Sequence, residues 1–120
     1  MSPAEDAGLL LSIVRRHLVA LRLGLDPVFP AEDWGFTAQQ ALKKLLKAQI
    51  VLADRDPPRR HDLGELAALA EAQLRPELLE LQVFAVEARY EEGPFALPAE
   101  RAWILAELEL LLMATESRLA

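Results

Sequence analysis

Apolar residues recur with the helical period along almost the whole chain, and no segment alternates between apolar and polar residues as a half-buried strand does. In residues 7–25 the apolar positions share one side of a predicted helix, while Arg15, Arg16 and Arg22 fall on the other. This helix ends near Gly24, since Pro27 cannot continue it. The chain therefore opens with an amphipathic helix followed by a loop.

A second helix is predicted over residues 33–52. Its apolar stripe leaves out all three lysines and contains Trp34, Ala38, Ala41, Leu42, Leu45 and Gln49. The linker over 53–60 contains Pro57 and Pro58, which favour an extended and stiff conformation.

Three further helices are predicted, over residues 63–74, 76–88 and 98–118. Asp62 and Glu65 have the spacing of a capping box for the first of them, and Pro76 and Pro98 open the other two. Five helices joined by short connections predict an all-α fold, an antiparallel up-and-down bundle of four to five helices in a single domain spanning 1–120. The last helix is apolar over more than half of its circumference, so it is either central to the bundle or shared with a second copy. We expect a homodimer.

Composition narrows the function more than the fold. The chain has 120 residues, a formal net charge of −6 and no cysteine, which excludes thiolate chemistry and argues against a general nucleic-acid coat. An apolar run such as 110–114 is far too short to cross a bilayer, and the first residues do not resemble a signal peptide. We therefore expect a cytoplasmic protein without a membrane partner.

The common catalytic arrangements have few residues to draw on. The three serines do not lie in a strand–turn–helix elbow, the five glycines do not form a phosphate loop, and His17 and His61 lie on different predicted helices. No pair of histidines or carboxylates has metal-ligand spacing. No metal and no resident cofactor are expected, although a nucleotide remains a candidate ligand.

The strongest candidate site lies where the linker enters the third helix. Arg55, Arg59, Arg60 and His61 place cationic and general-base groups near a helix N-terminus, which favours anions. A histidine and an arginine supply the base and the cation that metal-free RNA cleavage needs. The alternative is that Asp62 caps the helix, His61 packs at its entry and the arginines are solvated.

Two other groups of residues are candidates for anion binding. Lys43 and Lys47 are i, i+4 neighbours, and together with Lys44 they form either an anion-binding groove or a solvated helix face. Arg89 and Tyr90 end the fourth predicted helix, where they either cap its carbonyl groups or stack on a base.

Three segments resemble the HEPN domain family. Residues 36–48 (FTAQQALKKLLKA) resemble its helix-two signature F-H-A-Q-Q-A-x-E-K-x-L-K-A. Residues 60–63 (RHDL) are similar to its T-H-D-L, and residues 85–90 (AVEARY) to its A-x-x-A-R-Y-P. The segments occur in the family's order, and the resemblance covers roughly residues 8–118.

The resemblance implies an all-α bundle that commonly dimerises and often accompanies a small nucleotidyltransferase in a module of toxin–antitoxin type. Nucleotide binding has been proposed for the family, and many members are metal-independent ribonucleases that use an arginine and a histidine separated by four to six residues. Arg55 and His61 fit that spacing, but Pro57 and Pro58 lie between them, so the segment is not the helix that normally carries the motif. Thr37, Lys43 and Glu91 also depart from the family's His, Glu and Pro, and Lys43 makes the lysine groove more cationic.

Three hypotheses follow, of which the third is a purely structural dimer that scaffolds another protein through its last helix. The leading one is a non-catalytic, nucleotide-binding HEPN protein that pairs with a small nucleotidyltransferase, with an anion site formed by Lys43, Lys44, Lys47, Arg59, Arg60, His61, Arg89 and Tyr90. The alternative is a metal-independent ribonuclease toxin that acts on RNA through His61 and a nearby arginine, with Arg55 first.

Overall fold

The computed structural model describes residues 2–59, 62–85 and 93–119. These residues contain no strand, and their helices pack as an up-and-down bundle, which confirms the all-α prediction. The elements are α1 (Pro3–Leu23), α2 (Ala31–Leu52), α3 (Leu63–Ala70), α4 (Pro76–Leu79), the 3₁₀ helix η1 (Glu80–Phe84), α6 (Arg101–Glu116) and the 3₁₀ helix η2 (Ser117–Leu119). None of the described helices combines the length and the apolar character required to cross a membrane.

Helix α1 begins four residues before the predicted start because its first turn is capped. The Ser2 hydroxyl accepts a hydrogen bond from the Glu5 amide at 3.2 Å, and the Glu5 carboxylate accepts one from the Ser2 amide at 3.3 Å. Pro3 occupies the first helical position, where its missing N–H is not needed. Gly24 ends the helix as predicted.

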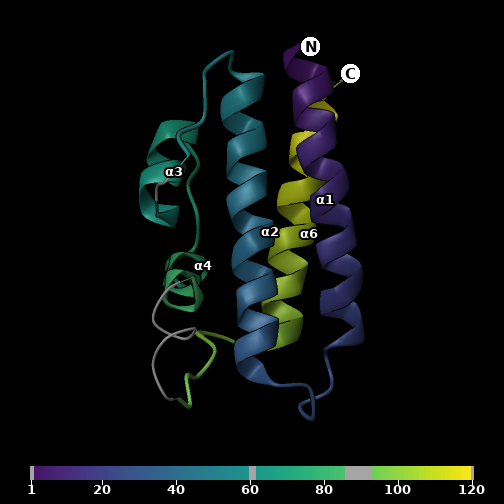
Figure 1. Ribbon diagram of the computed structural model, residues 1–120, viewed down its shortest axis with the longest axis vertical. Helices are drawn as coiled ribbons and strands as arrows, with labels where there is room; N and C mark the ends of the chain where they lie inside the picture. The colour runs from purple at the N-terminus through teal and green to yellow at the C-terminus, as the bar shows by residue number, and fades with distance from the viewer. Residues whose placement is uncertain (1, 60–61, 86–92, 120) are drawn as a thin grey trace.

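Helix α2 is the centre of the bundle. Figure 1 shows α2 between α1 on one side and α3 and α4 on the other, with α6 behind it. It buries side chains on most of its circumference, namely Trp34, Ala38, Gln39, Ala41, Leu42, Leu45, Leu46, Ala48 and Ile50. The prediction that the last helix could be the central one is therefore wrong. That helix, α6, buries one side and leaves Leu110 60% and Met113 66% exposed.

The loop between α1 and α2 is held by the first residue of α6. The Arg101 guanidinium donates hydrogen bonds to the carbonyl oxygens of Gly24, Asp26 and Phe29 at 2.7, 3.0 and 2.7 Å. It also lies 5.9 Å from the centre of the Trp34 ring, within the range of a cation–π interaction. Helix α6 begins at Arg101 rather than at the predicted Pro98. It ends at Glu116, and η2 then continues past the predicted end at Arg118.

Helices α3 and α4 are shorter than the sequence pattern predicts. Asp62 caps α3 as expected, accepting a hydrogen bond from the Glu65 amide at 2.8 Å. Glu71 then adopts a left-handed conformation (φ 55°) that ends α3 four residues before the predicted Leu74. After α4, the chain tightens into η1, whose period of three residues per turn aligns the buried side chains of Leu78, Leu81 and Phe84. The part of the fourth predicted helix beyond residue 85 lies outside the described residues.

Candidate anion-binding site

One face of α2 is only partly buried. Its half-buried residues include Gln40, Lys43, Lys44 and Lys47, and we call these four residues the lysine face. They lie on one side of α2 because Lys43, Lys44 and Lys47 follow Gln40 by three, four and seven residues. The sequence predicted this grouping, and the structure places all three lysines on the same side of α2.

The three ammonium groups of the lysine face repel one another. Partial burial lowers the pKa of Lys44 and that of Lys47, and the charge of Lys43 lowers both further. No ion pair joins these lysines to a carboxylate in the described part of the chain. The polar partner of Lys44 is neutral, because its ammonium donates a hydrogen bond to the Gln40 amide oxygen at 3.0 Å. A bound anion would therefore stabilise the charged form of each amine.

A histidine on α1 belongs to the same electrostatic environment. Burial is the main cause that lowers the pKa of His17, and the charges of Lys44 and Arg16 lower it further. The sequence pattern showed only that His17 and His61 lie on different predicted helices. The signal that identifies it is its spacing along α1, where Asp6, Leu10, Ile13 and His17 form one half-buried stripe.

Arg55, the first candidate for a catalytic arginine, binds the far end of α3. Its guanidinium donates a hydrogen bond to the Leu69 carbonyl oxygen at 3.1 Å and lies 3.9 Å from the Glu71 carboxylate. Asp62 marks the opposite end of this eight-residue helix, which is about 12 Å long. In the described structure Arg55 thus stabilises the C-terminal end of α3.

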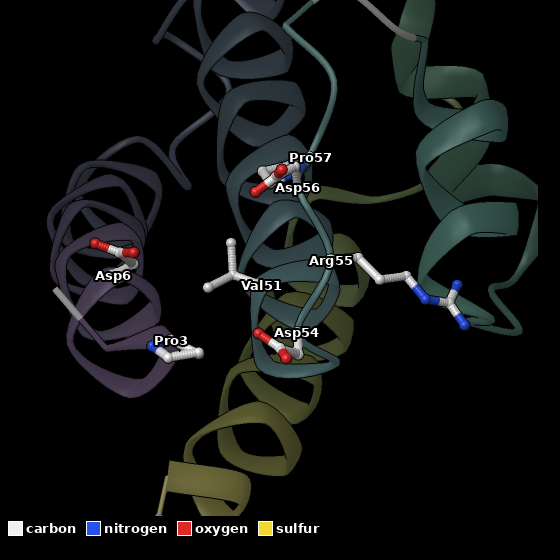
Figure 2. Close-up of a pocket in the computed structure, with 7 residues that line it drawn as sticks. All are labelled: Pro3, Asp6, Val51, Asp54, Arg55, Asp56 and Pro57. Carbon is white, nitrogen blue, oxygen red and sulfur yellow. The ribbon is translucent and has the colours of Figure 1, made fainter.

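The pocket beside Arg55 has the wrong charge for an anion. Its volume is about 430 Å³, and it lies between the first turns of α1 and the end of α2. Figure 2 shows the carboxylates of Asp6, Asp54 and Asp56 around it, whereas the Arg55 side chain points away toward α3. Among the described residues, no three or more histidines or carboxylates lie together in a way that could hold a metal ion.

Of the remaining candidates from the sequence, the described structure includes Arg59 alone. Arg59 is exposed in the linker before α3. Arg60, His61, Arg89 and Tyr90 lie outside the described residues. Their roles, and the pairing of Arg55 with His61, stay predictions.

Comparisons with known proteins place the chain in a family. Neither the curated proteins nor the solved structures contain a match. The family model of the HEPN domain matches residues 30–109. This match runs from the start of α2 into α6 and includes the lysine face, and it spans well over half of the chain. The chain therefore belongs to the HEPN domain family.

Proposed function

We propose that this chain is a non-catalytic HEPN protein that binds the phosphate groups of a nucleotide on its lysine face. The observation that carries the proposal is a set of three partly buried lysines on one side of α2, with no carboxylate partner among the described residues. The formal net charge of the chain is −6. Because the protein as a whole repels anions, attraction at this face has to be local and short-ranged.

Phosphate fits this face better than a carboxylate does. A nucleotide carries several charged oxygens that can satisfy more than one ammonium group at once. Lys43 and Lys47 lie one turn apart, about 6 Å between their β-carbons, so neighbouring phosphates can contact different lysines. Lysine side chains commonly pack their aliphatic stems along a protein surface while their amines stay accessible to a ligand.

Calorimetric titration with ATP, ADP and AMP tests nucleotide binding. We expect affinity to fall in the order ATP, ADP, AMP, and to weaken as salt rises. The double variant Lys43→Gln, Lys47→Gln should lose at least about tenfold in ATP affinity, which corresponds to roughly 1.4 kcal/mol.

Arg22→Gln is the matched control for this titration. It also removes a positive charge from a helix, but Arg22 lies on the side of α1 that faces α6, 3.5 Å from the Glu109 carboxylate. ATP affinity should therefore stay within about twofold of the parent, since an exposed pair contributes little. Absence of heat with all three nucleotides would remove the nucleotide from the proposed function.

We also propose a homodimer formed through the exposed side of α6. Leu110 and Met113 are 60% and 66% exposed, one turn apart on the same helix. Ala102 and Ala106 lie on the same side and are exposed too. A stripe of this kind suits contact with an apolar surface, and a second copy presents the same stripe.

The proposed macromolecular partner is a small nucleotidyltransferase, in a cytoplasmic module of toxin–antitoxin type. Membership of the HEPN family supports this part of the proposal. Pull-down of the tagged chain from the native host, read by mass spectrometry, tests it. Recovery of a small nucleotidyltransferase supports the two-component module, whereas recovery of the chain alone favours a self-contained homodimer.

The alternative function is a metal-independent ribonuclease, and the position of His61 directly after Arg59 and Arg60 in the sequence supports it. Since Arg55 contacts Leu69 and Glu71, the arginine beside His61 would then be Arg59 or Arg60. This function predicts RNA cleavage that EDTA does not affect and that His61→Ala abolishes. Cleavage that survives His61→Ala would exclude a catalytic role for His61.

A further inference from the structure

The seam between α1 and α2 brings a histidine to the edge of the lysine face. On α1, Arg15 and Arg22 pair with Glu116 and Glu109 of α6 at 2.6 and 3.5 Å. The half-buried stripe of Asp6, Leu10, Ile13 and His17 lies on the other side of the buried core positions of α1, away from α6. Asp6 lines a pocket together with Val51. Val51 lies one turn after Lys47, on the side of α2 that carries the lysine face. The stripe that ends at His17 therefore borders the lysine face.

The register of the two helices sets the level of His17. The helices run antiparallel (Figure 1), with Asp6 near Val51 at one end and the Trp34 indole N–H donating to the Leu21 carbonyl oxygen at 3.0 Å at the other. His17 lies one turn before Leu21, so it is level with the turn of α2 that follows Trp34 and leads to Gln40. Lys44 reaches back to this level, since its ammonium binds the Gln40 amide oxygen at 3.0 Å.

We propose that His17 is a ligand-binding residue of the lysine face, and that its imidazole and the Lys44 ammonium bind one phosphate group at the seam of α1 and α2. This inference rests on the proposed function and adds a residue from a second helix. The ligand it selects is a tetrahedral dianion, either inorganic or the phosphate end of a nucleotide. Binding should strengthen when His17 becomes protonated, because the ring then donates from both nitrogens and adds a positive charge.

The charged groups around His17 agree with an anion site. Arg16 on α1 and Lys44 on α2 act on it, both with positive charge. The carboxylates on the same sides of these helices are Asp6, about three turns from His17, and Asp33, about two turns from Gln40. Neither has an ion pair with His17 or Lys44 among the described contacts. An anion would thus supply a counter-charge that the described residues around His17 and Lys44 do not provide.

Sulfate is the appropriate probe, because it stays a dianion where histidine titrates. Calorimetry and the NMR signals of the imidazole rings should show sulfate binding about tenfold tighter at pH about 5.5 than at about 7.5. His17→Gln should retain the weaker binding and lose this pH dependence, and it also identifies the His17 ring signals, which sulfate should shift. Arg15→Gln, which removes a positive charge on the α6 side of α1, should keep the pH dependence of the parent.

The outcomes separate this inference from the proposed function. Full pH dependence in His17→Gln, or sulfate that leaves the His17 signals unmoved at pH about 5.5, overturns the role of His17 even if ATP binds the lysine face. Failure of both sulfate and ATP to bind overturns the anion site as a whole. Equal affinity for ATP and inorganic triphosphate would show that the site selects phosphate alone, whereas tighter ATP binding would show that the nucleoside contributes.

Discussion

The lysine face of α2 and the exposed apolar side of α6 differ in chemistry although both belong to the same bundle. The side of α2 carries half-buried lysines, whereas that of α6 exposes Leu110 and Met113. Partly buried charged amines can bind a small anion but resist burial under another protein. Covering exposed apolar side chains with another protein is favourable, because it removes apolar surface from water. The difference supports the two proposals made above, small-anion binding on α2 and association with a second copy through α6.

The largest expected effect comes from a substitution that displaces α2 and so disturbs the lysine face and the exposed side of α6 together. A β-carbon added at Gly35 would lie 2.7 Å from atoms of the Phe84 ring, which is fully buried. Gly35→Ala should therefore reduce the free energy of unfolding by about 1–3 kcal/mol, as overpacking of a core does. Chemical denaturation measures this, and loss of ATP binding should accompany it.

Gly8→Ala is the matched control. Gly8 lies within α1, and a β-carbon there would have no neighbour within 4 Å. The substitution should raise the free energy of unfolding by about 0.5–1 kcal/mol, because alanine loses less conformational entropy than glycine in a helix. Equal behaviour of the two variants would show that Gly35 is not needed for close packing against η1.

The next effect concerns the α6 side alone. Leu110→Glu with Met113→Glu should convert a dimer to a monomer, weakening association by roughly two orders of magnitude or more for two apolar side chains removed. Sedimentation at several protein concentrations measures the change. Because both side chains are exposed, the free energy of unfolding of the monomer should change by no more than about 0.5 kcal/mol. A monomeric parent protein would refute the dimer.

The sequence pattern could not decide which apolar residues of α6 are exposed. The pattern made α6 apolar on most sides, so it did not separate Leu108, which is fully buried, from Leu110, which is exposed. A charge at Leu108 would disrupt the core rather than test an interface. The position of a helix in the bundle depends on contacts distant in sequence, and periodicity carries no such information.

The same limit applies to the shorter helices and to the site. The sequence predicted the lysine face, the cap at Asp62 and the end of α1 near Gly24, because each is set by neighbours within one or two turns. It placed the end of α3 too late, since the left-handed Glu71 and the contact from Arg55 depend on the fold. It missed His17 as a neighbour of Lys44, because only packing of α1 on α2 brings them together.

A smaller effect sharpens the charge on the α2 side. Lys43 lowers the pKa of both Lys44 and Lys47, so Lys43→Gln relieves repulsion in the absence of ligand. The free energy of unfolding at low salt should rise by about 0.2–0.5 kcal/mol, and added salt should erase the gain. Thermal unfolding at low and high salt measures it. A loss of stability at low salt would mean that Lys43 has an attractive partner.

The smallest expected effect is on how stability varies with pH. The pKa of His17 lies below the ordinary value of 6.5, so the folded protein takes up this proton less readily than the unfolded chain does. The contribution of His17 to stability is therefore complete above pH 6.5 and falls as pH drops through its lowered pKa.

Denaturant titrations of the parent and His17→Gln over this pH range measure the difference. Their free energies of unfolding should differ by a constant amount above pH 6.5, and the parent should then lose stability faster as acid is added. Carboxylates that titrate at lower pH affect both proteins alike and cancel in the difference. Curves that remain parallel would mean that the surroundings of His17 do not disfavour its charge, and Lys44 would then not be its neighbour. Added sulfate should reduce the acid-dependent loss in the parent alone, since an anion at the seam offsets the repulsion that causes it.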